Sequence, residues 1–429
     1  MKTENGKLKK YKLGEYIDSF GDGIHGTPNY DEKGEYYFIN GNNLKDGQLN
    51  ITEDTLKISS NEYSKIKRRL IPNNTILVSI NGTLGNVALY KSENIALGKS
   101  ACYLNLKDSS FRFFLRYLLK TKEFKNYMNR VAGQSTIKNV SPTQISEYEF
   151  FAPPLESQQK IAAVLSALDD KIALNNRMNA KLEQMAKRLY DYWFVQFDFP
   201  NADDKPYKST GGKMVWNEEL KREIPEGWEV KKISEILDCE IPGDWGEEEI
   251  KGNHKYKVNC IRGCDMVDMT DLPVRYILES NSKKLLQKDD FVIEISGGSP
   301  TQSTGRIVQI TDEIIKRFNG KIICSNFCHG IRLNDKDYAS YFFQMWNMFY
   351  LNNIFFNYEG KTSGLKNFQF DTFVSETWYV PPKELVRKYH EVVSKFRKQI
   401  DINESETQKL TVLRDRLLPL LMNGQVVVE

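Results

Sequence analysis

Residues that could bind phosphate or a metal ion occur at only a few places in this sequence. Gly98-Lys99-Ser100 matches the end of a phosphate-binding loop, but such a loop needs a glycine five residues earlier, and that position is Glu93. A carboxylate there would repel phosphate. The four histidines, at positions 25, 254, 329 and 390, show no spacing typical of metal ligands. Neither feature predicts a nucleotide site or a histidine metal site.

A second candidate is a nuclease-like group of residues, Pro242, Asp244, Glu249 and Lys251. Its carboxylates are too close in sequence to come from the two strands of one hairpin, and residues 247–251 read as a solvated run of charges. The Asn/Asp-Pro-Pro-Tyr/Phe motif of an amino-methyltransferase is also missing, because both Pro-Pro pairs follow Ala or Val. We therefore expect no catalytic centre in this chain.

The six cysteines include two pairs with a C-x3-C spacing, Cys260/Cys264 and Cys324/Cys328. Four thiolates are the ligand set of a structural zinc site. The segment 324–328, however, lies in a β-like run, where the two-residue period places both sulfurs on one buried face. Buried free thiols are the favoured interpretation, because free cysteine is among the most buried residue types. The zinc alternative stays open.

Two polar, glycine-containing loops, 79–86 and 296–306, carry the side chains that contact base edges and phosphates in protein–DNA complexes. Two later segments, 134–138 and 361–366, have the same character. Loops of this composition can equally be hairpin turns, where Gly and Asn are common for steric reasons. The predicted DNA-binding residues of the first half are Arg68, Arg69, Ser79, Asn81, Thr83, Asn86, Gln134, Ser135, Thr136 and Lys138. Those of the second half are Ser296, Ser299, Thr301, Gln302, Arg306, Lys361, Thr362 and Lys366.

These loops are related by an internal repeat. The Lys-Asn pairs 138–139 and 366–367 are offset by 228 positions, and the Pro-Pro pairs 153–154 and 381–382 have the same offset. The offset then holds without a gap for about fifty residues. A weaker repeat extends upstream and relates 77–82 to 292–297. The period is too long for a solenoid, so the sequence predicts a duplicated module.

The constant part of each module has the pattern of a long helix. Apolar residues follow a 4-3-4-3 spacing from Ile161 to Leu189 and again from Tyr389 to Leu417. Such a spacing over about four heptads predicts a coiled coil, and Asn175 and Asn403 occupy matched seam positions, where a buried Asn fixes register. The alternative is that each helix packs only on its own domain.

Composition supports a folded chain of several domains. Of the 429 residues, 40% are apolar and 27% are charged, which excludes a disordered or collagenous protein. No apolar stretch of about 18 residues is present, and the first residues do not resemble a secretory signal, so we expect a cytoplasmic protein. Residues 1–153 carry a net charge of +6 and residues 200–381 a net charge of −5. The second half is therefore not a self-sufficient basic DNA-binding surface.

The predicted fold class is α+β. Two similar α/β domains are joined by two long helices that form an antiparallel coiled coil, which gives the chain a pseudo-two-fold repeat. The predicted boundaries are a first domain at 1–153, a first helix at 154–199, a crossover linker at 200–227, a second domain at 228–381 and a second helix at 382–425.

The segments 152–162, 165–179, 182–186 and 192–194 together resemble the spacer of a type I restriction–modification specificity subunit. The likeness covers the whole chain as target-recognition domain, spacer helix, target-recognition domain and spacer helix. In the second spacer, Lys383-Glu384-Leu385 and Arg397-Lys398-Gln399 depart from the pattern. The resemblance implies a non-catalytic subunit whose two domains each recognise half of a split double-stranded DNA sequence.

The resemblance further implies a heteromeric complex. Two modification subunits would bind S-adenosylmethionine and methylate adenine N6, and restriction subunits would use ATP and Mg²⁺; this chain itself would hold no cofactor. We expect the aromatic residues Tyr192, Trp193 and Phe194 to be exposed and to dock the modification subunits. The alternatives are a stand-alone DNA-binding or adaptor protein, and the recognition part of a fused restriction–methylation enzyme.

Overall fold

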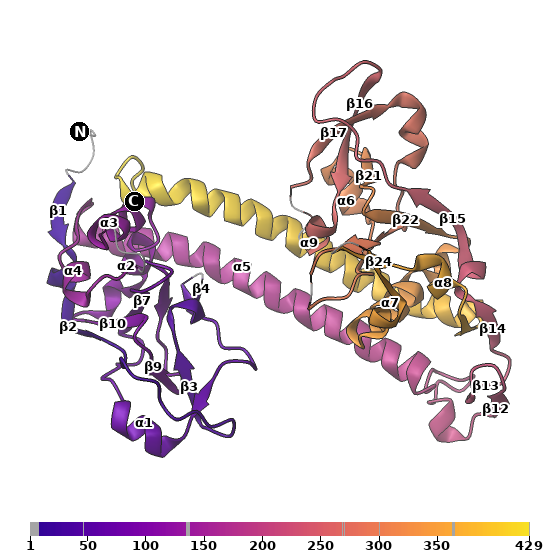
Figure 1. Cartoon of the computed structure of the whole chain (residues 1–429), viewed down its shortest axis with the longest axis horizontal. Coiled ribbons are helices and arrows are strands. Elements are labelled where there is room, and N and C mark those ends of the chain that lie inside the picture. Colours follow the sequence, from indigo (N-terminus) through magenta and orange to yellow (C-terminus); the bar gives the residue numbers. More distant parts are fainter. Residues whose placement is uncertain are drawn as a thin grey trace. The chain divides into compact units, whose positions relative to one another are not determined.

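The computed structural model describes residues 8–45, 47–133, 138–267, 269, 271–299, 301–362 and 365–428, and the side chains of residues 361 and 362 lie outside this description. The chain forms two compact units. The first unit contains residues 1–172 together with 409–429, and the second contains residues 173–408. Two long helices, α5 (Leu155–Tyr190) and α9 (Lys383–Met422), contribute to both units and are magenta and yellow in Figure 1.

The domain of the first unit is built on a four-stranded antiparallel sheet with the order β2-β10-β7-β8. Its strand β7 is an unbroken apolar and hydroxyl run with every residue buried, as expected for an inner strand. A smaller sheet has the order β6-β3-β9, and β1 pairs with β11. The strands are β1 (Lys9–Lys12), β2 (Ile17–Asp22), β3 (Tyr36–Ile39), β6 (Lys57–Ile58), β7 (Thr75–Ser79), β8 (Val87–Leu89), β9 (Ile95–Leu97), β10 (Ala101–Leu106) and β11 (Glu149–Ala152).

The domain of the second unit repeats this topology. Its four-stranded sheet has the order β15-β22-β18-β20, its second sheet the order β17-β16-β21, and β14 pairs with β25. In both domains one pair of the smaller sheet is parallel, β3 with β9 and β16 with β21. The strands are β14 (Glu229–Lys232), β15 (Leu237–Pro242), β16 (His254–Ile261), β17 (Val274–Leu278), β18 (Phe291–Glu294), β20 (Ile307–Gln309), β21 (Ile322–Cys324), β22 (Cys328–Leu333) and β25 (Thr377–Val380). The predicted duplication is confirmed at the level of strand order.

After β10 the first unit forms two helices, α2 (Arg112–Leu118) and α3 (Lys122–Val131). Thr121 caps the second helix, because its hydroxyl accepts a hydrogen bond from Phe124 N–H. In the second unit α7 (Ala339–Leu351) is followed by a 3-10 segment, Ile354–Tyr358. No helix among the described residues is long and apolar enough to cross a membrane.

Within each unit, segments of α5 and α9 pack together and close the core of the domain. In the first unit, Ile161 and Leu165 share a core with Leu421 and Met422. In the second unit, Ala186 and Tyr190 share a core with Val386, Tyr389 and Val393. Tyr389 Oη donates a hydrogen bond of 3.1 Å to the carbonyl of Ala186. The two helices therefore pack on each other, and the alternative that each packs only on its own domain is wrong.

The seam asparagines are buried in the second unit. Asn175 donates from Nδ2 to Glu406 Oε2 at 2.8 Å, and Asn403 donates from Nδ2 to Asn179 Oδ1 at 2.7 Å. Together with the 3.1 Å bond between Tyr389 and Ala186, these contacts run in opposite directions along the two helices, so the pairing is antiparallel, as predicted. A polar layer at this position specifies one register of the helix pair.

Candidate DNA interface

In the first unit, Ser79 organises the predicted loop that follows β7. Its side chain is fully buried, donates from Oγ to the carbonyl of Thr83 at 2.5 Å and accepts from Asn86 N–H at 2.8 Å. Gly82 and Gly85 have positive φ angles of 72° and 77°, which L side chains rarely adopt. Ser79 thus holds the loop, whereas Thr83 at its tip is exposed.

The structure brings this loop against the predicted Lys-Asn segment. Asn81 forms an antiparallel bridge with Asn139, and Val140 N–H donates to the carbonyl of Ile80 at 2.9 Å. Lys138 is exposed and donates from Nζ to Asn129 Oδ1 at 2.9 Å. Two polar segments more than fifty residues apart therefore form one surface.

The second unit places the equivalent segments together in the same way. Strand β19 (Ser296–Gly297) pairs with β24 (Leu365–Phe368), so that Ser296 faces Asn367 and Gly297 faces Lys366. Ser296 Oγ donates to Asn367 Oδ1 at 2.6 Å. The same pair of loops is thus built twice, once in each domain.

Internal ion pairs hold the loop of the second unit. Arg306 donates from Nε and Nη2 to the two carboxylate oxygens of Glu294, both at 2.8 Å, and these bonds raise the pKa of the guanidinium. Lys366 Nζ lies 3.2 Å from Glu359 Oε2 and donates to the carbonyl of Gln302 at 3.1 Å. The side chains of Glu294 and Glu359 are only 8% and 7% exposed. The charges of Arg306 and Lys366, two predicted DNA-binding residues, are therefore neutralised by ion pairs within the domain.

The other predicted residues fall into three groups. Thr301 and Gln302 are exposed at the tip of the second loop, and Ser299 supports them by accepting from Gln302 N–H at 3.2 Å. Arg69 is exposed, whereas Arg68 donates from Nε to the carbonyl of Asp22 at 2.8 Å and holds the end of β2. Outside the described residues or side chains lie Gln134, Ser135, Thr136, Lys361 and Thr362.

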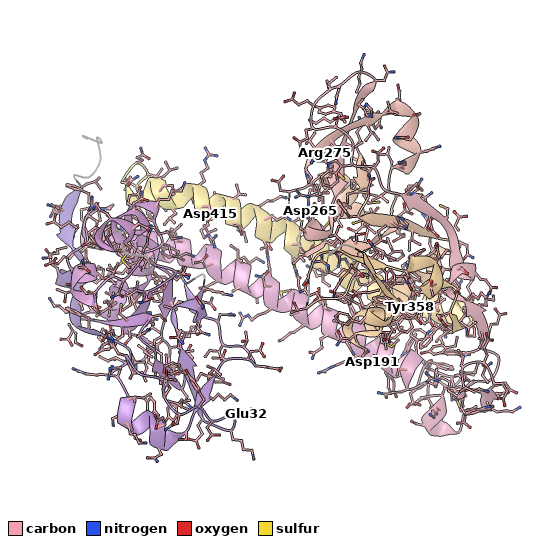
Figure 2. All side chains as sticks on the ribbon, in the orientation of Figure 1. Glu32, Asp191, Asp265, Arg275, Tyr358 and Asp415 are labelled. Carbon is pink, nitrogen blue, oxygen red and sulfur yellow. The ribbon has the colours of Figure 1, made fainter. Side chains whose placement is uncertain are left out.

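The expectation that the aromatic residues after α5 are exposed is wrong for two of the three. Trp193 is 8% exposed and Phe194 is fully buried, because a π-helical turn, Asp191–Val195, rotates both rings into the core of the second unit. Phe194 packs edge-on against Tyr389 at a ring distance of 5.0 Å. Asp191, labelled in Figure 2, pairs with Lys187 at the start of this turn. Only Tyr192 remains exposed.

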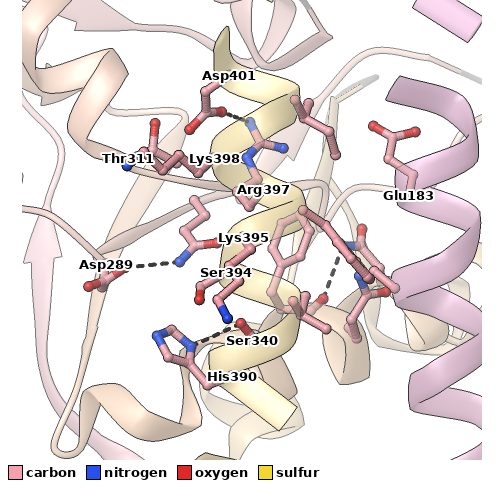
Figure 3. A pocket seen from close by; sticks show the side chains of 18 of the residues that line it. Glu183, Asp289, Thr311, Ser340, His390, Ser394, Lys395, Arg397, Lys398 and Asp401 are labelled. Atoms are coloured by element: carbon pink, nitrogen blue, oxygen red, sulfur yellow. Dashed lines mark hydrogen bonds and ion pairs between the residues drawn. The ribbon is translucent and has the colours of Figure 1, made fainter. Parts of the chain in front are cut away.

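The second unit also contains a cavity of about 780 Å³ that sequence reasoning missed (Figure 3). Segments of α5, α7 and α9 line it, and one ion pair lies in its wall: Arg397 Nη2 lies 3.0 Å from Asp401 Oδ1. Burial raises the pKa of the Asp401 carboxyl despite this cation. Since cations and carboxylates line the cavity in similar numbers, it does not form a basic DNA-binding site.

The cysteines of the second unit have mixed environments. Cys260, Cys324 and Cys328 are buried, and burial raises the pKa of the thiols of Cys260 and Cys328 to about 12. Cys264 is exposed. Over the part of the chain that the structure describes, no three His, Cys, Asp or Glu side chains are grouped so that they could hold a metal ion.

Comparison with known proteins identifies the family. Residues 5–184 and 225–412 each match the type I restriction modification DNA specificity domain. The chain belongs to this family. Its two specificity domains coincide with the two repeats of the fold, so this specificity subunit has the composition expected for recognition of a bipartite DNA sequence.

Individual relatives agree with this assignment. The specificity subunit is 29% identical over 395 residues to the type I restriction enzyme MjaIX specificity subunit of Methanocaldococcus jannaschii, covering 89% of this chain and 83% of that protein. It is 25% identical to the HindI specificity subunit of Haemophilus influenzae, covering 73% and 77% of the two chains. A type I restriction–modification S subunit from M. genitalium shares its fold, with a TM-score of 0.62 over 98% of both chains at 19% identity.

Proposed function

We propose that each domain of this chain recognises one half of a bipartite DNA site and that the helix pair sets the distance between the halves. One observation carries the proposal: the same pair of polar loops is built twice on the same strand order, at Asn81/Asn139 and at Ser296/Asn367. Because α5 and α9 are continuous and contribute to both units, a change in their length is transmitted to both domains.

We infer that the chain is not itself an enzyme. Its predicted DNA-binding residues are amides, hydroxyls and cations without the paired acid–base groups or activated nucleophile that catalysis needs. Modification subunits would bind S-adenosylmethionine and methylate adenine N6, and restriction subunits would use ATP and Mg²⁺ to cut DNA. The specificity subunit would supply recognition and spacing to both.

We further propose that the exposed face of α5 docks a modification subunit, in place of the buried Trp193 and Phe194. Within the second unit Leu174, Met178 and Met185 are 42%, 38% and 51% exposed and follow a heptad-compatible spacing along one face. Such an exposed apolar stripe on a helix is typical of a protein–protein interface.

Substitution on this stripe tests the docking proposal. The double variant Met178→Glu/Met185→Glu should lose co-purification with the modification subunit and keep its own thermal unfolding temperature, because both side chains are exposed. Ile250→Glu, an exposed apolar residue outside the helices, is the matched control and should co-purify normally. Normal co-purification of the double variant would refute this docking site.

The non-catalytic role is tested with the purified components. The chain alone, incubated with S-adenosylmethionine and duplex DNA, should transfer no methyl group, whereas the complex with its modification subunits should methylate adenine at one bipartite sequence. Methyl transfer by the isolated chain would instead support the fused-enzyme alternative. Specific DNA binding by the isolated chain with no effect of modification subunits would support a stand-alone DNA-binding protein.

A further inference from the structure

The two domains differ in charge next to their matched loops. Between positions 111 and 131 the first domain has six cations and a single acidic residue, Glu123; the cations are Arg112, Arg116, Lys120, Lys122, Lys125 and Arg130. The corresponding segment of the second domain, residues 339–358, has neither Lys nor Arg. The difference is large for segments that a duplication made equivalent.

Arg116, Arg112 and Lys120 interact with other groups of the chain. Arg116 is buried and pairs with Asp169, and Arg112 donates from Nη1 to the carbonyl of Asn73 at 2.7 Å. Lys122 and Lys125 on α3 are exposed, and no carboxylate of the described residues lies within ion-pair distance of either ammonium group. These two charges are therefore available to a ligand.

The position of α3 links these charges to the predicted DNA loop. A Cβ placed on Gly85 would lie 3.7 Å from Lys125 Cγ, so the loop 81–86 packs directly against this part of the helix. Lys122, Lys125 and Asn129 share one helical face, being three and seven residues apart. Asn129 in turn accepts the hydrogen bond from Lys138. The cations of α3 thus continue the polar surface formed by the two loops.

The equivalent segment of the second domain, residues 339–358, has no such cations. The loop of this domain packs instead against aromatic residues: Trp346 Nε1 donates to the carbonyl of Gly305 at 2.7 Å, and Lys366 stands over the ring of Phe356 at 4.6 Å. Two cations beside this loop, Arg306 and Lys366, pair with the nearly buried Glu294 and Glu359. Among the side chains that the structure describes, this loop therefore presents to DNA the neutral polar set around Thr301 and Gln302.

From these observations we infer that α3 of the first domain is a phosphate-binding site that anchors the complex to DNA, and that the equivalent segment of the second domain, residues 339–358, provides no such anchor. The inference rests on the proposed function, since it assigns an electrostatic role to one of the two DNA-recognising domains. Each Lys–phosphate contact releases about one counterion, so the first domain should carry much of the salt dependence of binding.

The salt dependence of DNA binding tests the inference. The complex of this chain with its modification subunits is titrated against two DNA duplexes at several KCl concentrations. One duplex carries the target sequence that the complex methylates, and the other carries a scrambled sequence. Lys122→Gln/Lys125→Gln should reduce the slope of log K against log salt by about two and weaken binding to both duplexes by a similar factor. The methylated sequence itself should not change.

A matched control comes from the same sheet. Lys91 follows β8, and Lys107 follows β10, at the end of the sheet opposite to the loop, because Asn105 of β10 pairs with Thr75 while Ala101 pairs with Ser79. Lys91→Gln/Lys107→Gln makes the same change in charge and should leave the slope near that of the parent complex. An unchanged slope in the α3 variant, or an equal fall in the control, overturns the inference. A parent complex that does not bind the duplex with the target sequence more tightly than the scrambled duplex would instead refute the proposed function.

Discussion

Inserting one heptad into both α5 and α9 should lengthen the gap, the stretch of DNA between the two half-sites that neither domain recognises. The insertion belongs after Ile172 in α5 and after Gln408 in α9, between the contacts that each unit makes for itself. In the first unit Arg414 donates from Nη1 to Asp169 Oδ1 at 2.9 Å, and in the second unit Asn403 donates to Asn179 at 2.7 Å. Paired insertion keeps both contacts.

The expected change follows from helix geometry. Seven residues at about 1.5 Å each add about 10 Å to each helix and rotate the seam by only about 20°. At about 3.4 Å per base pair this is a lengthening of up to three base pairs, reached if the helix pair runs parallel to the DNA axis. Both half-sequences should stay the same, because the loops themselves are unaltered.

Insertion into α5 alone is the discriminating control. The contact between Asp169 and Arg414 and the contact between Asn179 and Asn403 can then not both form without distortion of one helix. Since a lost hydrogen bond to a charged group costs about 1.5–3 kcal/mol, this variant should unfold at a lower temperature than the paired insertion.

Mapping methylated adenines in cells that carry each variant reads out the gap directly. An active complex with the paired insertion and the original gap would refute the reasoning and would assign spacing to the domains. A gap that lengthens equally in the single-helix variant would show that the register contacts do not matter.

Two further predictions concern stability. Trp193→Ala should lower the free energy of unfolding by about 3–5 kcal/mol in denaturant titrations, because the ring is buried in the core of the second unit; a loss of partner binding at unchanged stability would contradict its burial. Burial alone would raise the pKa of the Asp169 carboxyl, but hydrogen bonds from Tyr117 and Arg414 and the charge of Arg116 hold it below its usual value. A carboxyl group whose pKa is lowered by folding stabilises the folded state above about pH 4. This stabilisation is lost as the pH falls through the pKa of the folded state. Asp169→Asn should therefore cost about 3 kcal/mol at pH 7, and the difference from the parent protein should shrink in acid; a constant difference between pH 7 and pH 3 would contradict this.

The sequence predicted the architecture well because its signals were periodic. Two signals depend on spacing alone: the 228-residue offset, and the heptads of Ile161–Leu189 and Tyr389–Leu417. Spacing can be recognised in the sequence without knowledge of tertiary contacts. The buried seam residues Asn175 and Asn403 were predicted on the same basis. The loop at 79–86 contacts the segment at 138–140, and one feature of the sequence hinted at this contact. Both repeats contain the same two polar segments at equivalent positions.

The errors arose where tertiary packing decides exposure. Trp193 and Phe194 continue an amphipathic helix in sequence, and only the π-helical turn at Asp191–Val195 directs both rings inwards. Arg306 and Lys366 have the residue type of DNA-binding side chains, but their acidic partners Glu294 and Glu359 lie 12 and 7 positions away along the chain, so sequence did not reveal that they are neutralised. Lys125 on α3 was missed as a DNA-binding residue because it lies beside the loop at Gly85, 40 positions away along the chain.

Exchange of the first domain tests the central claim of independent half-site recognition most directly. Residues 1–150 are replaced by the corresponding domain of a specificity subunit with a different known target, and methylated adenines are mapped across the genome. The account predicts that one half of the bipartite sequence is replaced by that of the donor while the other half and the gap stay the same. A change in both halves, or in neither half of an active complex, would contradict it.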